Sequence, residues 1–112
     1  QRTKKKIARS FTEKLQEVHC LIGATIPCLP PELGTDSMQI NGREEIVVDA
    51  FTRLNAPQNL SGIPALALPC GFSKTGLPLS MQIIGSSGQD RLVLQVGQFY
   101  QTLTNWHRRN PF

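Results

Sequence analysis

The sequence has no apolar run that approaches the roughly 20 residues needed to span a bilayer, so no membrane partner is expected. Its N-terminus is charged and is not followed by the apolar segment of a secretory signal. The first residue is Gln1 rather than Met. That start suggests either a processed product or a piece of a longer protein.

Cysteine is scarce, and its spacing matches no known cysteine framework. Cys20, Cys28 and Cys70 are odd in number and form no C-x-x-C pair. Neither a disulfide framework nor a zinc site is therefore favoured. We expect three reduced thiols in a cytoplasmic protein, with no bound metal.

Acidic residues are outnumbered by basic ones, yet the imbalance is local. The chain has 112 residues, so it is at most one domain, and its hydrophobic content of 39% is typical of globular proteins. Residues 1–18 carry six Lys/Arg against Glu13 and Glu17, which equals the net charge of +4. Such a basic helix can bind nucleic acid or an anionic membrane. Too few cations and aromatics are present for that, so a solvated helix face is favoured and no nucleic-acid partner is expected.

Helical periodicity occurs in three segments. Arg2–Val18 has apolar residues spaced four, three and four apart, which predicts an amphipathic helix. Arg43–Leu54 has a similar apolar face and is predicted to be a second helix. Asp90–Trp106 carries a broad apolar stripe, with Asp90 as its N-cap or as an acid in its first turn. Gly97 inside this third helix indicates close packing against another element.

Two further segments come before the centre of the chain. His19–Thr25 is a short apolar run, which predicts a buried strand. Prolines and Gly34 then exclude regular structure through about Asp36. Residues 28–42 are predicted to be an exposed excursion with a turn at Asn41–Gly42. Pro57 is predicted to end the second helix, and a turn follows it.

The centre of the chain is Asn59–Gly85, which predicts two strands joined as an antiparallel hairpin by Gly71–Pro78. Because proline is excluded from the interior of a central strand, the first strand is predicted to be short, Ala65–Leu68. The second strand alternates between two faces. One face carries Leu79, Met81 and Ile83, and the other carries Ser80, Gln82 and Ile84.

Three motifs follow one another in this half of the chain. They are N-L-S-G-I-P-A-L-A-L-P-C-G-F at Asn59–Phe72, G-L-P-L-S-M-Q-I-I-G at Gly76–Gly85, and an acid that opens a helix ending in W-H-x-x-x-P. In this order they resemble the C-terminal end of the amidase signature family. The upstream F-T-E-K-L-Q-E-V-H-C-L-I-G-A-T-I-P is similar to the family's helix-then-strand segment. The chain departs from the family at His19, where Asp is usual, and at Ser80, where glycine is commoner.

The resemblance implies an α/β fold, namely the C-terminal portion of a mixed-sheet amidase signature fold, with short strands packed with amphipathic helices. Residues 1–112 would be the C-terminal segment of an amidase domain, with the N-terminal catalytic half absent. The resemblance also implies hydrolysis of the C–N bond of a small amide substrate through a serine acyl-enzyme, without metal or cofactor. Unpaired strand edges in such a segment would favour a homo-oligomer.

Family members use a triad of Lys, cis-Ser and Ser, in which a neutral lysine acting through one serine activates the other. In the family this triad precedes the matched segment, so it would lie before Gln1. No catalytic residue is therefore predicted within the chain, and the chain alone is expected to be inactive. The rival hypothesis is a non-catalytic binding or scaffold module derived from the family.

Other reactive side chains have simpler interpretations. Ser86–Ser87 resembles part of a Gly/Ser signature, but it occupies a variable loop of the family and fails the G-x-S-x-G spacing. Cys70 has no local histidine base and suits a small buried hydrophobe. Lys74 fits a solvated turn. A structural role or a helix C-terminal charge is favoured for His19 and His107.

Asp90 is the one residue predicted to bind substrate. In some family members an acid near this position holds the substrate's amino group, and Asp90 could do so by charge pairing. Its competing role is that of a helix cap. Asn59 and Gln82 are expected to brace the turn and the strand through hydrogen bonds.

Overall fold

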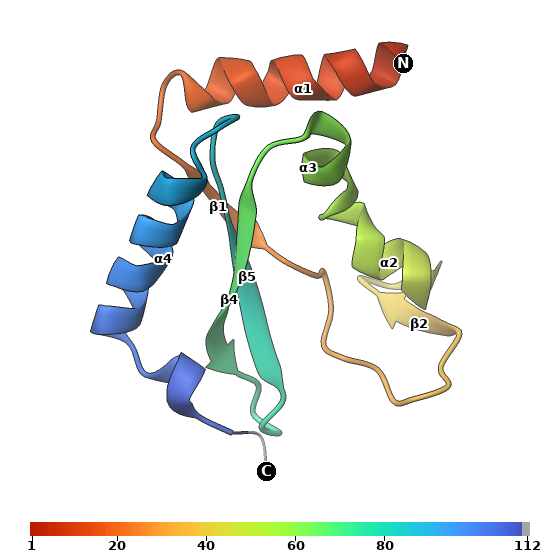
Figure 1. Cartoon of the computed structure of the whole chain (residues 1–112). Helices are drawn as coiled ribbons and strands as arrows, with labels where there is room; N and C mark the ends of the chain where they lie inside the picture. The colour runs from red at the N-terminus through yellow and green to blue at the C-terminus, as the bar shows by residue number, and fades with distance from the viewer. Residues whose placement is uncertain (111–112) are drawn as a thin grey trace.

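The computed structural model describes residues 1–110, which form four α-helices, five strands and one short 3-10 helix (Figure 1). Pro111, which closes the last quoted motif, lies outside the described residues. Among residues 1–110, no helix is both long enough and apolar enough to cross a bilayer. The elements in chain order are α1 (Arg2–Leu15), β1 (Leu21–Ala24), β2 (Ser37–Ile40), β3 (Arg43–Ile46), α2 (Val47–Arg53), α3 (Ala56–Ser61), β4 (Ala65–Phe72), β5 (Pro78–Ile84), α4 (Asp90–Leu103) and η1 (Trp106–Arg108).

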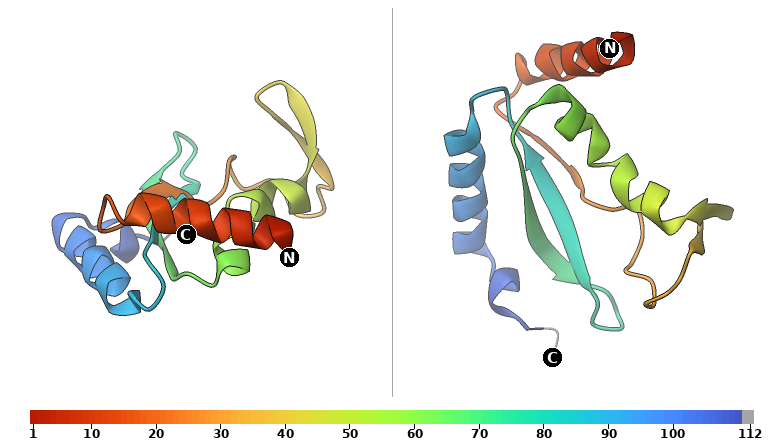
Figure 2. Two further views of the ribbon diagram at one scale, coloured as in Figure 1. Left: turned by 90° about the horizontal axis from the view of Figure 1, so that it is seen from above. Right: turned by 45° about the vertical axis from the view of Figure 1, so that its right-hand side comes forward.

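The main sheet has the strand order β1-β5-β4, and both of its pairings are antiparallel. The hairpin predicted from the sequence is therefore confirmed, with β5 as the central strand. Ile83 of β5 lies opposite Ile22 on one side and Leu66 on the other. Figure 2 shows α4 on one side of this sheet and α2–α3 on the other. Helices and short strands thus pack together as the predicted α/β class requires.

The predicted end of β4 at Leu68 is wrong. The strand continues through Pro69 to Phe72, and its register shifts between Pro69 and Gly71. Cys70 is the extra residue of this bulge. The proline is tolerated because β4 is an edge strand, so its missing amide breaks no pairing with a further strand.

The core lies between the sheet and α4. Leu68, Ile83 and Val93 are its buried residues, and Met81 packs against them. A Cβ added at Gly97 would lie 2.5 Å from Cδ2 of Leu66, so the predicted close packing of this glycine is confirmed. The helix ends at Leu103, three residues before the predicted Trp106, which begins η1.

Helix α1 lies across the top of the sheet and contacts α3 (Figure 1). Its apolar face is turned toward the rest of the molecule: Leu15 is buried, and Ile7 and Phe11 are half-buried. The predicted amphipathic helix is confirmed, although it ends at Leu15 rather than near Val18.

Strand β1 is not buried as predicted. Ile22 lies beside the fully buried Ile83, yet its side chain is 63% exposed. The reason is its position: β1 is an edge strand, and α4 packs on β4 and β5. The apolar run His19–Thr25 therefore marks a strand, but one whose face has no cover within the described residues.

The segment before α2 also differs from prediction. Arg43–Ile46 is not helical but pairs with Ser37–Ile40 as a second antiparallel hairpin. The predicted turn at Asn41–Gly42 joins the two strands, and both residues have positive φ (50° and 76°), as a tight two-residue hairpin turn requires. The helix begins only at Val47, and Pro57 falls in the first turn of a separate helix, α3. Proline is favoured there because the first amides of a helix have no acceptor.

Candidate functional site

A polar network ties the α2–α3 side of the molecule to the sheet. Nε2 of Gln82 donates to the backbone oxygens of Ala24 and Leu54, each at 2.9 Å. Oε1 of Gln82 accepts from Nε2 of Gln58 at 3.0 Å. Gln82 therefore links β1, α2 and α3 to the central strand, which confirms its predicted bracing role. Asn59, the other predicted brace, is exposed and takes part in no side-chain hydrogen bond within residues 1–110.

Ser80 adds a second link across the same face. Its hydroxyl donates to the backbone oxygen of Leu68 at 3.2 Å and lies 2.9 Å from Oγ1 of Thr25. The amide of Asn55 donates to the backbone oxygen of Thr25 at 3.1 Å. The serine that replaces the commoner glycine thus connects β5 to β4 and to the end of β1.

The loop between β5 and α4, residues 85–89, runs beneath α1 at the end of the sheet (Figure 1). It begins where the amide of Gly85 donates to the backbone oxygen of Pro64 at 3.0 Å. A Cβ at Gly85 would lie 2.5 Å from Cγ2 of Val93, so the chain passes tightly against α4 here. The amide of Gln89 then donates to the oxygen of Ser86 at 3.0 Å, and α4 follows. The loop is thereby fixed at both of its ends.

Two hollows adjoin this loop, and Ser86 lines both. The first has a volume of about 400 Å³ and lies between the end of α1 and the start of α4. The second has a volume of about 230 Å³ and lies between α1 and α3. Their other polar lining residues are Gln16, Glu17, His19 and Gln89 in the first and Thr12, Ser61 and Ser87 in the second. These hydroxyl, amide and carboxylate groups suit the binding of a small polar molecule.

Asp90 is the first residue of α4, and Gln89 is the N-cap. Of the two structural roles predicted for Asp90, the structure shows the first-turn acid rather than the cap. Its carboxylate is exposed at the side of a third hollow of about 180 Å³, whose apolar walls include Pro64 and Leu66. A negative charge beside an apolar recess is an arrangement that can hold an amine with an apolar body.

The remaining reactive side chains are dispersed. Lys74 is exposed in the β4–β5 turn, which lies at the opposite end of the sheet from residues 85–89 (Figure 1). Cys70 is half-buried in the bulge of β4, and all three cysteines are free thiols. His19 lines the 400 Å³ hollow, whereas His107 belongs to η1. Within residues 1–110, no three His, Cys, Asp or Glu side chains gather closely enough to hold a metal ion.

Sequence reasoning missed Gln58, although it is only 5% exposed and is bonded to Gln82. Its Oε1 is buried and has no hydrogen-bond partner within the described residues. The sequence offers one usable signal, because Gln58 directly follows a proline that starts a helix. Reading Pro57 as a helix start would have placed Gln58 on α3.

The chain resembles known proteins in both its sequence and its fold. A family model described as Amidase matches residues 1–94. A glutamyl-tRNA(Gln) amidotransferase subunit of Thiobacillus denitrificans is 34% identical over 111 residues, and its counterpart in Hahella chejuensis is 39% identical over 114 residues. Each match covers 99% of this chain but only 22% of the relative. The chain therefore spans about a fifth of the length of these curated relatives.

A solved structure shows the same fold. A crystal structure of an amidase superposes with a TM-score of 0.84 and 27% sequence identity. The match covers 91% of this chain and 23% of that chain. The helices and strands described above thus occur together within a larger protein.

Proposed function

Because the chain belongs to the amidase signature family, we propose that it is the C-terminal segment of an amidase that cleaves carboxamide C–N bonds through a serine acyl-enzyme. The observation that carries the proposal is the extent of the match. The family model covers residues 1–94, and the two amidotransferase relatives align with 99% of this chain over 22% of their own length. The nucleophile and its base would belong to the part of the enzyme upstream of Gln1.

In this proposal the segment supplies structure and a wall of the substrate site. Gln82 and Ser80 hold the sheet to its flanking elements, and the β5–α4 loop is fixed at both ends. A rigid frame of this kind keeps binding groups in place for a reaction that depends on geometry. The three free thiols suit a cytoplasmic enzyme.

We further propose that Asp90 holds the amino group of a cationic amide substrate. Its support is the exposed carboxylate beside the apolar recess at Pro64 and Leu66. The charge would pair with the ammonium group, and the recess would cover the substrate's apolar carbons. The small amide substrate of the parent enzyme would then be an amino-substituted one.

The Asp90 proposal predicts a selective kinetic change in the intact enzyme. Asp90→Asn should raise KM about tenfold for an amino-substituted amide and leave KM unchanged for the matching neutral amide. A residue that only stabilises the start of α4 would lower thermal stability and affect both substrates equally. Asp49→Asn is the matched control, because Asp49 is an exposed acid in the first turn of α2.

The amidase proposal is tested by the coding sequence upstream of Gln1. A Gly/Ser-rich run with a lysine well before it would supply the triad. An upstream region without that run would overturn the amidase proposal and leave a binding or scaffold module.

A further inference from the structure

Two of the motifs quoted from the sequence meet at one end of the sheet. The first motif ends at Phe72, the last residue of β4, and the third includes Trp106, the first residue of η1. Figure 1 shows η1 folded back below α4, beside this end of β4, and the two elements are in contact. The ring centroids of Phe72 and Trp106 are 6.2 Å apart, and the ring planes are tilted by 53°. We call these two half-buried rings the aromatic pair.

Arg109 occupies the aromatic pair. Its Cζ lies 4.5 Å from the centroid of the Phe72 ring and 5.7 Å from that of the Trp106 ring. Both distances are within the roughly 6 Å over which an aromatic face attracts a cation. The position of Arg109 is set by η1, because side chains three residues apart in a 3-10 helix lie above one another. The amide of Arg109 donates to the oxygen of Trp106 at 3.2 Å, which closes this turn.

The rings, rather than a carboxylate, hold the Arg109 guanidinium. Within residues 1–110 no ion pair involves Arg109, and its side chain is exposed. At an exposed site the attraction between a cation and an aromatic ring is weak, a factor of about two to five in an equilibrium constant. A second cation of the same kind can therefore compete with Arg109 for the rings.

We propose that the aromatic pair is a binding site for an organic cation, and that Arg109 blocks this site from within the chain. The ligand class follows from the lining. Two rings without a carboxylate favour a weakly hydrated cation, namely a guanidinium or a quaternary ammonium group, over Na⁺ or a primary ammonium group. The incoming cation displaces the Arg109 side chain, and η1 then loses its guanidinium link to β4. This inference is independent of the proposed amide chemistry.

The fluorescence of Trp106 reports on the site directly, because Trp106 is the only tryptophan of the chain. Titration of the 112-residue chain with tetramethylammonium chloride should change the emission saturably, whereas NaCl at equal concentration should not. Arg109→Gln removes the competing cation, so this variant should bind tetramethylammonium about three- to sixfold more tightly than the wild type. Arg91→Gln is the matched control, because it removes an exposed cation from α4 and changes the net charge equally. Its affinity should equal that of the wild type.

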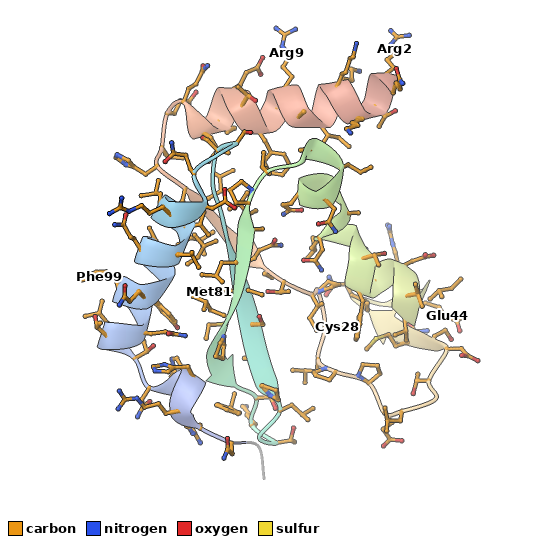
Figure 3. All side chains as sticks on the ribbon, in the orientation of Figure 1. Arg2, Arg9, Cys28, Glu44, Met81 and Phe99 are labelled. Carbon is orange, nitrogen blue, oxygen red and sulfur yellow. The ribbon has the colours of Figure 1, made fainter. Side chains whose placement is uncertain are left out.

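Removal of one ring tests the site itself. Phe72→Leu in the Arg109→Gln background keeps an apolar side chain but removes an aromatic face, so binding should be lost. Phe99→Leu in the same background is the control, because Phe99 lies on the outer side of α4 and is 65% exposed (Figure 3). Circular dichroism checks that each variant is folded. The proposal would be overturned by an Arg109→Gln chain that shows no saturable response or the same response to NaCl. Equal affinities of the wild type and Arg109→Gln, or of the Phe72 and Phe99 variants, would also overturn it.

Discussion

Nε2 of Gln58 donates a 3.0 Å hydrogen bond to Oε1 of Gln82, and this bond joins α3 to the central strand of the sheet. Both side chains are buried, at 5% and 4% exposure. The two other hydrogen bonds of Gln82 are donated by its Nε2 to backbone oxygens, so its Oε1 must be the acceptor from Gln58. The orientation of both amides is thereby fixed, and the oxygen of Gln58 is left without a donor within the described residues.

Replacing Gln82 should destabilise the fold more than replacing Gln58. Gln82→Met removes three buried hydrogen bonds: the two that Nε2 donates to the oxygens of Ala24 and Leu54, and the one that Oε1 accepts from Gln58. We expect a loss of about 2–4 kcal/mol in the free energy of unfolding. Gln58→Met breaks one bond and leaves Oε1 of Gln82 without a donor, but it also removes an unpaired buried oxygen, so its cost should be smaller, about 1 kcal/mol. Urea denaturation measures both values.

Gln95→Met is the control for these two variants, because Gln95 is exposed on α4. It should change the free energy of unfolding by no more than about 0.5 kcal/mol. A larger loss for Gln58→Met than for Gln82→Met would contradict the assignment of Gln82 as the centre of the network.

Gly85→Ala should destabilise the junction between β5 and α4. The new methyl group would lie 2.5 Å from Cγ2 of Val93, which is β-branched and 2% exposed. Overpacking of this kind costs about 1–3 kcal/mol. The double variant Gly85→Ala/Val93→Ala should lose less stability than the sum of the two single variants, because Val93→Ala removes the clash. Thermal denaturation of the three variants gives this coupling.

Gly23→Ala is the matched control for the junction. Gly23 is in β1, and no atom lies within 4 Å of its added Cβ. Its replacement should be neutral or slightly stabilising, because alanine is less flexible than glycine in the unfolded chain. Equal losses at positions 23 and 85 would show that steric contact with Val93 is not the cause.

The parts of the fold that were predictable are those where one face is apolar. The periodicity of Arg2–Leu15, the alternation of β5 and the stripe of α4 each report a buried face, and each element is present. The β2–β3 hairpin was missed although S-M-Q-I of β2 alternates, with Met38 half-buried and Ile40 buried, because four residues are too short a pattern to stand out and β3 is mostly charged and exposed. Its residue Ile46 instead completed the helical spacing of α2, which drew Arg43–Ile46 into a predicted helix.

Less of the candidate site was predictable than of the fold. Gln82 was identified because a polar residue interrupts an apolar strand, which marks a buried polar group. Gln58 was missed because α3 has only six residues and no apolar periodicity of its own. The hollows around Ser86 join residues from α1, α3 and α4, and no local pattern records which of these segments meet.

Cys28 should react slowly with alkylating agents in the folded chain. Burial raises the pKa of its thiol above the usual 9.0; the charge of Glu45 raises it further, and that of Arg53 opposes the rise. At a given alkaline pH, a smaller fraction of the native thiol than of the unfolded thiol is therefore ionised. Iodoacetamide labelling near pH 9, followed by peptide mass spectrometry, should show a lower rate for native than for unfolded Cys28.

The raised pKa of Cys28 also makes the stability of the fold depend on pH. A thiol whose pKa is raised by folding contributes stability that is fully present below pH 9.0 and is lost as pH rises through the folded value. Glu45→Gln should lower the pKa of Cys28 and speed its alkylation. The change removes the negative charge that raises this pKa, and it releases Arg53 from its 2.8 Å ion pair with Glu45. Glu44→Gln is the control, and an equal acceleration by both variants would contradict the assignment to Glu45.

The central claim is that these 112 residues are the C-terminal segment of an amidase. A chimera, in which the chain replaces the matching segment of a relative, tests it most directly. Residues 1–112 would replace the matching segment of the Hahella chejuensis amidotransferase relative, to which the chain is 39% identical. We predict that the chimera retains amidotransferase activity, whereas the 112-residue chain alone hydrolyses no amide. A chimera that folds and assembles without activity, or serine-dependent turnover by the isolated chain, would contradict the claim.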